Sequence, residues 1–192
     1  MKLAKKQLEK NKKKIIELLE ETARPGIDNI INWLENDTDF FTAPASTRLD
    51  YHGSHEGGLA QHALNVYETF EAKAGMYDLN LKPEERTIAS ICHDMCKINT
   101  YIPNILKSGN ISGAKPYVVE DALPLGHGEK SVYLVSRHIE LTTNEALLIR
   151  WHMGPFDAEW ENHENKVISI CPAIYAFHTA DQEASKYMDL KK

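Results

Sequence analysis

Residues 83–98, PEERTIASICHDMCKI, decide the fold class because they join a clear helix start to a polar pair in an otherwise apolar setting. Pro83 suits the first turn of a helix, where its missing N–H breaks no hydrogen bond. The two glutamates after it favour the positive end of the helix dipole. His93 and Asp94 follow near the end of the segment. Neighbouring residues of a helix point about 100° apart, so these two side chains can reach one metal ion from a single turn.

Helical patterns continue on both sides of this segment. Near the N-terminus, Leu8, Ile15, Leu18 and Leu19 form an apolar stripe with helical spacing. Residues 99–124 are instead rich in glycine, proline, asparagine and β-branched side chains, which is typical of a loop with short strands. We therefore predict an all-α bundle of at least seven helices, with a small β-hairpin or irregular insertion around 99–124. The predicted helices cover residues 3–22, 25–34, 58–73, 83–98, 127–140, 143–153 and 170–188.

Length and composition indicate one folded unit. A chain of 192 residues with 42% hydrophobic and 26% charged residues suits a single compact domain. Within it we expect residues 1–50 to form N-terminal helices that pack on a core domain of residues 51–192. No apolar run reaches the ~18 residues of a membrane span, and the first lysines are not followed by the apolar core of a signal peptide. We expect a cytoplasmic protein without a membrane partner.

Charge is distributed unevenly. The chain has a net charge of −6, and its first 14 residues carry seven lysines and one glutamate, so the remaining 178 residues carry −12. Phosphate contacts supply most of the affinity for nucleic acid, so an acidic body is a poor surface for long nucleic acid. The lysines could tether the protein to nucleic acid or a membrane, but a solvated helix end is the more common role for such a run.

The three cysteines, Cys92, Cys96 and Cys171, are too few and odd in number for a disulfide framework. Cys92 and Cys96 are four residues apart beside an apolar stretch, which favours two small buried hydrophobic side chains. Zinc binding by this pair is the weaker alternative, because the spacing is not that of a zinc knuckle.

Nine histidines occur in the chain, and several fall on predicted apolar helix faces. A single histidine there is more often a hydrogen-bonded core residue than a ligand. A buried imidazole or carboxylate without a partner costs several kcal/mol, however, and a metal centre is one partner that many of them can share. The ordered set predicted to share it is His62, His93, Asp94, His127, His152 and Asp181.

With these motifs the sequence resembles the HD-domain superfamily of metal-dependent phosphohydrolases. The resemblance covers residues 51–186 and depends on EGGLAQHALNVYE, ICHDMCKI, GHGEKS, RWHM and TADQEAS. It implies an α-helical fold and a metal site of His62, His93, Asp94 and Asp181. Both GHGEKS and RWHM contain a histidine, and in this the sequence resembles the two-metal members of the superfamily. The resemblance therefore implies that His127 and His152 hold a second ion and that Asp94 bridges the two ions.

The sequence departs from two branches of this superfamily. The cyclic-dinucleotide phosphodiesterases carry paired histidines and a GYP sequence after the fifth ligand, whereas this chain has RWHMGPFDAEW there. The exoribonuclease branch adds a nucleic-acid-binding module, for which this chain has no room. The resemblance therefore implies a small phosphorylated substrate, expected to be a nucleotide, and argues against long RNA.

The chemistry of these residue types agrees with that expectation. Imidazole and carboxylate together suit transition metals. For the two divalent ions that the resemblance implies, we therefore expect Mn or Fe first, with Zn, Ni or Co as alternatives. A water bridging two such ions is activated for attack on phosphorus. Lys97, four residues after His93, is expected to place its ammonium against a phosphate oxygen as a catalytic and substrate-binding group. The alternative is a surface lysine at a helix end, where the helix dipole favours a cation. The loop histidines His52 and His55 are candidate substrate-binding residues at the mouth of the site.

Two alternatives from other functional classes stay open. Some proteins that look like HD domains hold a mixed-valence di-iron centre with the same set of ligands and cleave C–C or C–P bonds with O₂. A binding or regulatory module that senses nucleotides without turning them over is the third candidate, although such members should lose ligands first. The phosphohydrolase is preferred, and neither the substrate nor the oligomeric state follows from the sequence.

Overall fold

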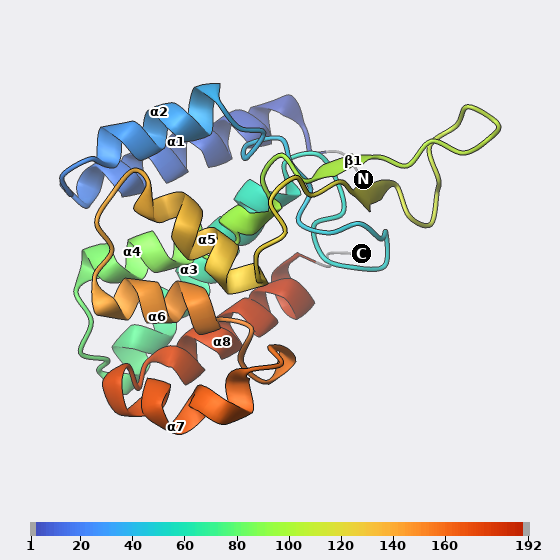
Figure 1. Cartoon of the computed structure of the whole chain (residues 1–192). Coiled ribbons are helices and arrows are strands. Elements are labelled where there is room, and N and C mark those ends of the chain that lie inside the picture. Colours follow the sequence, from blue (N-terminus) through green and yellow to red (C-terminus); the bar gives the residue numbers. More distant parts are fainter. Residues whose placement is uncertain (1–2, 190–192) are drawn as a thin grey trace.

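Helices account for most of residues 3–189, the part of the chain that the computed structural model describes (Figure 1). The prediction of a mostly all-α fold with a small hairpin is confirmed. The α-helices of these residues are α1 (Lys5–Glu21), α2 (Ile27–Asn36), α3 (Gly58–Tyr77), α4 (Pro83–Cys92), α5 (His127–Ser136), α6 (Thr143–Trp151), α7 (Trp160–Ile170) and α8 (Ile174–Glu183).

Helix α3 occupies the middle of the bundle. It packs against α1, α4 and α8, and α6 contacts both α4 and α8. Phe70 of α3 meets Phe177 of α8 edge to face, with ring centroids 4.8 Å apart and both side chains fully buried. Helices α1 and α2 lie side by side on one flank and α7 lies on the opposite one (Figure 1). Side chains from every α-helix contribute to one apolar core, which holds α3 in place.

Most predicted helix boundaries differ from the structure by a few residues, and the two largest differences concern the predicted helices 83–98 and 170–188. Helix α4 ends at Cys92 rather than at Ile98, and a short 3₁₀ turn at Met95–Lys97 follows it. The predicted helix 170–188 is interrupted around Cys171 and Pro172, so that α8 begins only at Ile174. Helix α7 was not predicted. Its sequence, WENHENKVISI, carries no continuous apolar stripe that would predict a helix. In the structure this helix buries only Trp160 and Val167.

The insertion predicted at residues 99–124 is a hairpin that projects from the bundle (Figure 1). Strands β1 (Tyr101–Pro103) and β2 (Tyr117–Val119) pair antiparallel, and an isolated bridge joins Ile105 to Ile111 further out. At its base, Lys130 of α5 forms an ion pair with Asp121 at 2.6 Å. The apolar core of the described residues contains no side chain from 99–124, so the hairpin adds nothing to that core.

None of the helices within residues 3–189 has both the length and the apolar character that crossing a membrane requires.

Candidate metal centre

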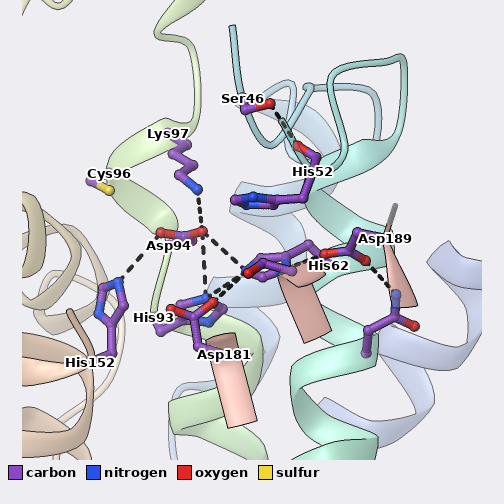
Figure 2. Close-up of polar contacts among 12 residues, drawn as sticks. Ser46, His52, His62, His93, Asp94, Cys96, Lys97, His152, Asp181 and Asp189 are labelled. Atoms are coloured by element: carbon purple, nitrogen blue, oxygen red, sulfur yellow. Dashed lines mark hydrogen bonds and ion pairs between the residues drawn. The ribbon is translucent and has the colours of Figure 1, made fainter. Parts of the chain in front are cut away.

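The six predicted ligands come together in the interior of the bundle. Figure 2 labels all of them except His127. Five of them are no more than 7% exposed, and the side chain of His127 is about a third exposed. Five separate segments deliver them: α3, the turn after α4, the start of α5, the end of α6, and α8. The converging residues are His62, His93, Asp94, His127, His152 and Asp181.

Asp94 stands at the centre of the group. Its Oδ1 lies 2.9 Å from His127 Nε2 and 3.6 Å from His152 Nε2. Its Oδ2 lies 3.6 Å from His62 Nε2 and 3.5 Å from His93 Nε2. Each carboxylate oxygen therefore faces a different pair of histidines, which is the arrangement a bridging ligand needs.

The end of helix α4 explains how Asp94 reaches this position. His93 closes the helix with α-helical angles, whereas Asp94 leaves it at φ −103° and ψ 23°, before the 3₁₀ turn. The backbone therefore turns between the two residues, and both side chains point into the bundle. Lys97 sits at the end of that turn, and its Nζ lies 2.6 Å from Asp94 Oδ2.

Two of the histidines have a defined tautomer when neutral. Nδ1 of His93 donates to the Ser90 carbonyl at 2.9 Å, and Nδ1 of His152 donates to the Ile149 carbonyl at 2.8 Å. A neutral imidazole bonded in this way keeps its lone pair on Nε2. In both rings Nε2 faces Asp94, and this is the nitrogen that a metal ion would take.

Nε2 of His152 gives a direct test of whether the site suits a metal. The atom is buried and has no hydrogen-bond partner within residues 3–189, because Asp94 is too distant at 3.6 Å. A buried polar atom without a partner is costly, and a cation among these imidazoles and carboxylates would satisfy it. The donor set of this chain therefore fits a divalent transition metal.

His62 is bound by carboxylates at both ring nitrogens. Its Nε2 lies 3.1 Å from Asp181 Oδ1, and its Nδ1 lies 2.7 Å from Asp189 Oδ2. Burial lowers the pKa of His62, but hydrogen bonds to these two carboxylates outweigh burial and raise the pKa to about 10. The charge on His62 in turn lowers the pKa of Asp181, against the effect of burial. A metal ion would take the place of the proton between His62 and Asp181, because ligands bind deprotonated.

His127 provides the exposed side of the cluster. Its Nε2 contacts Asp94, and its Nδ1 lies 3.3 Å from Cys96 Sγ. Burial lowers its pKa, yet the hydrogen bonds to Asp94 and Cys96 raise it to about 9. The predicted burial of Cys92 and Cys96 is confirmed, since both side chains are buried. Cys96 also lies beside Asp94 and His127, in a group whose ligand atoms could hold a metal.

His52 and Lys97 lie next to the cluster on the side of the loop that precedes α3 (Figure 2). A Cβ on Gly58 would overlap the backbone of Gly53, so this loop passes directly over the start of α3. The His52 ring is 4.8 Å from the His62 ring, and its Nε2 is buried without a partner among the described residues. Burial, with the charges of His62 and Lys97, lowers the pKa of His52 to about 3, so its ring is neutral.

The structure places His55, the other predicted substrate-binding histidine, apart from the cluster. Its Nδ1 pairs with the Glu56 carbonyl at 3.1 Å. It lines a separate pocket of about 430 Å³ together with Gln61, Asn65 and Asp189. No metal-binding group found among residues 3–189 includes His55.

Sequence reasoning missed one residue that contacts a ligand directly. Asp189 lies one position beyond the last predicted helix, and its carboxylate is the hydrogen-bond partner of His62 Nδ1. No motif marks it in the sequence. Asp189 lies eight residues after Asp181, which is about two helical turns, and this spacing could have indicated that both side chains lie on the same side of a helix.

Close packing between α5 and α6 brings His127 near His152, and Gly128 makes that packing tight. A Cβ at Gly128 would overlap the backbone carbonyl of Arg150, two residues before His152. We expect Gly128→Ala to lower the free energy of unfolding by about 2 kcal/mol, because helix α5 must move away from α6. Chemical denaturation followed by circular dichroism measures this.

Gly75 provides the matched control. It lies in α3, and a Cβ added there meets no atom within 4 Å. Gly75→Ala should leave stability unchanged or raise it by up to about 1 kcal/mol through better helix propensity. Equal effects of the two substitutions would contradict the assigned role of Gly128.

Comparisons with protein-family models, with curated proteins and with solved structures gave no match. The function is therefore inferred from the arrangement of these side chains and from the sequence motifs that carry them.

Proposed function

We propose that this protein is a metal-dependent phosphohydrolase that cleaves a phosphate ester of a nucleotide or a related small phosphorylated molecule. One observation carries the proposal: the two oxygens of Asp94 face two different pairs of histidines, and Lys97 lies against the same carboxylate. The order of these residues along the chain is also that of the two-metal HD-domain phosphohydrolases, which the sequence resembles.

In this proposal His62, His93, Asp94 and Asp181 would hold one ion, and His127 and His152, together with Asp94, would hold the second. Metal ions bound there would supply a nucleophilic water at neutral pH and positive charge for the phosphoryl oxygens. The protein fixes the ligands before the ions bind. In particular, the carbonyls of Ser90 and Ile149 set the tautomers of His93 and His152.

Lys97 would act on the substrate as well as on Asp94. Burial lowers the pKa of its ammonium, but the charge of Asp94 outweighs burial and raises it, so Lys97 stays positive. A compact ammonium with three donors can hold a phosphoryl oxygen and stabilise the charge that develops on it. His52 next to it is neutral and can hydrogen-bond a phosphate or sugar oxygen without adding charge.

The distribution of charge supports a small substrate. Outside its first 14 residues the chain carries a net charge of −12, which disfavours the many phosphate contacts of long nucleic acid. Lys97 is the lysine in contact with the cluster. One cation and two metal ions suit the phosphate group of a single nucleotide.

Removal of metal tests the proposal directly. Treatment with a chelator is expected to abolish phosphate release, and Mn²⁺ or Fe²⁺ should restore it. Chelator treatment should also lower the thermal midpoint of unfolding, because an ion that binds only the folded state stabilises it by RT ln(1 + c/Kd), where c is the free metal concentration. Elemental analysis, a phosphate-release assay on a panel of nucleotides and a thermal melt measure these effects.

His93→Ala serves as the reference variant in this assay. Metal-dependent phosphate release that is lost in His93→Ala supports the hydrolase. Phosphate release that survives in His93→Ala would show that the assigned centre is wrong. O₂ uptake by an iron-loaded sample without phosphate release would favour the di-iron oxygenase, and tight nucleotide binding without turnover would favour a regulatory module.

A further inference from the structure

Asp189 is a buried carboxylate that the proposed reaction does not use. Its side chain is 2% exposed, and both of its oxygens have partners. Oδ2 accepts from His62 Nδ1 at 2.7 Å, and Oδ1 accepts from Asn65 Nδ2 at 2.5 Å (Figure 2). A buried charge is costly unless it is paired and hydrogen-bonded in this way.

A π-helical turn brings Asp189 to this position. Helix α8 continues into the π-helix Ala184–Met188, and the N–H of Asp189 donates to the Ala184 carbonyl at 3.0 Å. Such turns interrupt α-helices frequently at functional sites. Asp181 and Asp189, on the same helical run, thus contact opposite nitrogens of one imidazole ring.

His62 differs from the other three histidines of the centre in what holds its Nδ1. His93 and His152 use backbone carbonyls for this atom, and His127 uses the Cys96 sulfur. His62 uses a carboxylate. A carboxylate behind a metal-binding histidine fixes the ring and makes its free nitrogen a stronger donor to the metal.

A chain of side-chain amides connects Asp189 to the N-terminal helix. Gln7 of α1 donates to Asn11 at 2.7 Å, and Asn11, only 3% exposed, donates to Gln61 of α3 at 2.9 Å. Gln61 donates to Asn65 at 2.9 Å, and Asn65 donates to Asp189. Each amide N–H in this series of hydrogen bonds is directed toward the next residue on the way to Asp189, so the amides together hold the Asp189 carboxylate in one place.

We propose that Asp189 is a positioning residue for the metal centre. It holds His62 in the tautomer with the proton on Nδ1, directs Nε2 toward Asp94 and Asp181, and strengthens His62 as a metal ligand. The amides from α1 and α3 keep Asp189 in place. This inference rests on the proposed metal centre but not on the reaction it performs.

Asp189 is better placed to form a hydrogen bond with His62 than to bind one metal ion together with it. The group of His52, His62 and Asp189 also has ligand atoms within 4.8 Å of one another. The 2.7 Å between His62 Nδ1 and Asp189 Oδ2 is a hydrogen-bond length. Two ligand atoms about 2.1 Å from one ion lie about 3 Å or more apart, so no ion fits between these two.

The test compares Asp189→Asn with the wild-type protein in Zn²⁺ binding, measured by competition with a chromophoric chelator. Asparagine preserves shape and removes the charge, so the dissociation constant for the ion at His62 should rise about 10- to 100-fold. The ¹⁵N chemical shifts of the His62 ring in the zinc-loaded protein report its hydrogen bond and should move as well. A merely structural role would change neither quantity in a folded variant.

Two further variants complete the test. Glu183→Gln removes a nearby carboxylate whose partner is Lys73, and it should leave zinc affinity unchanged. Asn65→Leu removes one partner of Asp189 and should weaken zinc binding less than Asp189→Asn does. If Asp189→Asn does not fold, Asn65→Leu decides the question by the same measurement.

The outcomes separate this inference from the proposed function. Unchanged zinc affinity and unchanged His62 shifts in a folded Asp189→Asn protein overturn the positioning role. Weakened binding supports it even if the wild-type protein releases no phosphate from any nucleotide. A wild-type protein that binds no zinc at these histidines overturns both the inference and the proposed centre.

Discussion

Asp94→Asn is expected to reduce phosphate release by about 10³-fold or more and to leave the helical fold in place. Asparagine has the volume of aspartate but only one uncharged oxygen acceptor, so it cannot serve two ions. Elemental analysis should then find fewer metal ions per chain than in the wild-type protein. The variant also loses the negative charge that faces Lys97 at 2.6 Å, so the thermal midpoint of the metal-free protein should fall.

Asp39→Asn is the matched control for this substitution. Asp39 also accepts a hydrogen bond, from the Asn99 backbone at 2.6 Å, but has no contact with the cluster. The phosphate release and the metal content of the Asp39→Asn protein should equal those of the wild-type protein. Full activity in Asp94→Asn would remove the basis of the proposed function.

Lys97→Met is expected to lower kcat by about 10²- to 10³-fold while the metal content stays the same. Methionine preserves most of the length of the side chain and removes the ammonium. Lys97 is not a ligand, and its charge repels metal ions, so metal binding should not weaken. Lys97→Arg should recover little activity, because a planar guanidinium cannot replace a compact ammonium in a buried position. Steady-state kinetics with the preferred nucleotide measure both variants.

Lys73→Met provides the comparison for Lys97→Met. Lys73 lies on α3 and forms an ion pair with Glu183 at 2.7 Å, outside the centre. Its loss should leave kcat unchanged. If Lys97→Met changes kcat no more than Lys73→Met does, the close contact between Lys97 and Asp94 has only a structural role.

The sequence marked the six residues that lie together in this cluster because they violate the usual pattern of a helical core. His62, His93 and His152 fall at positions where apolar side chains would otherwise pack, and polar residues there need a shared partner. Repeated exceptions of this kind on separate helices are visible without a structure. The helices that carry them were predictable because many of their other buried positions hold apolar side chains, such as Ile88 in α4 and Leu148 in α6.

The surroundings of the centre were not predictable in the same way. Asp189 reaches His62 only because of the π-turn, which no local pattern marks. His55 resembles His52 in sequence context, yet a loop conformation sends it to a different pocket. Helix α7 lacks an apolar stripe because it packs at the edge of the bundle through Trp160 and Val167. Loop paths and helix irregularities depend on tertiary contacts that a sequence pattern does not contain.

The projecting hairpin offers a place where the polypeptide could be cut into two fragments. A proteolytic cut beside Lys107, near its tip, would break no contact of the apolar core, which contains no side chain from residues 99–124. His62, His93 and Asp94 would then lie on one fragment, and His127, His152 and Asp181 on the other. The two pieces share the interior of the bundle and a single set of ligands. The chain thus lends itself to fragment complementation, in which metal bound at the proposed centre would favour the reassembled form over the separate halves.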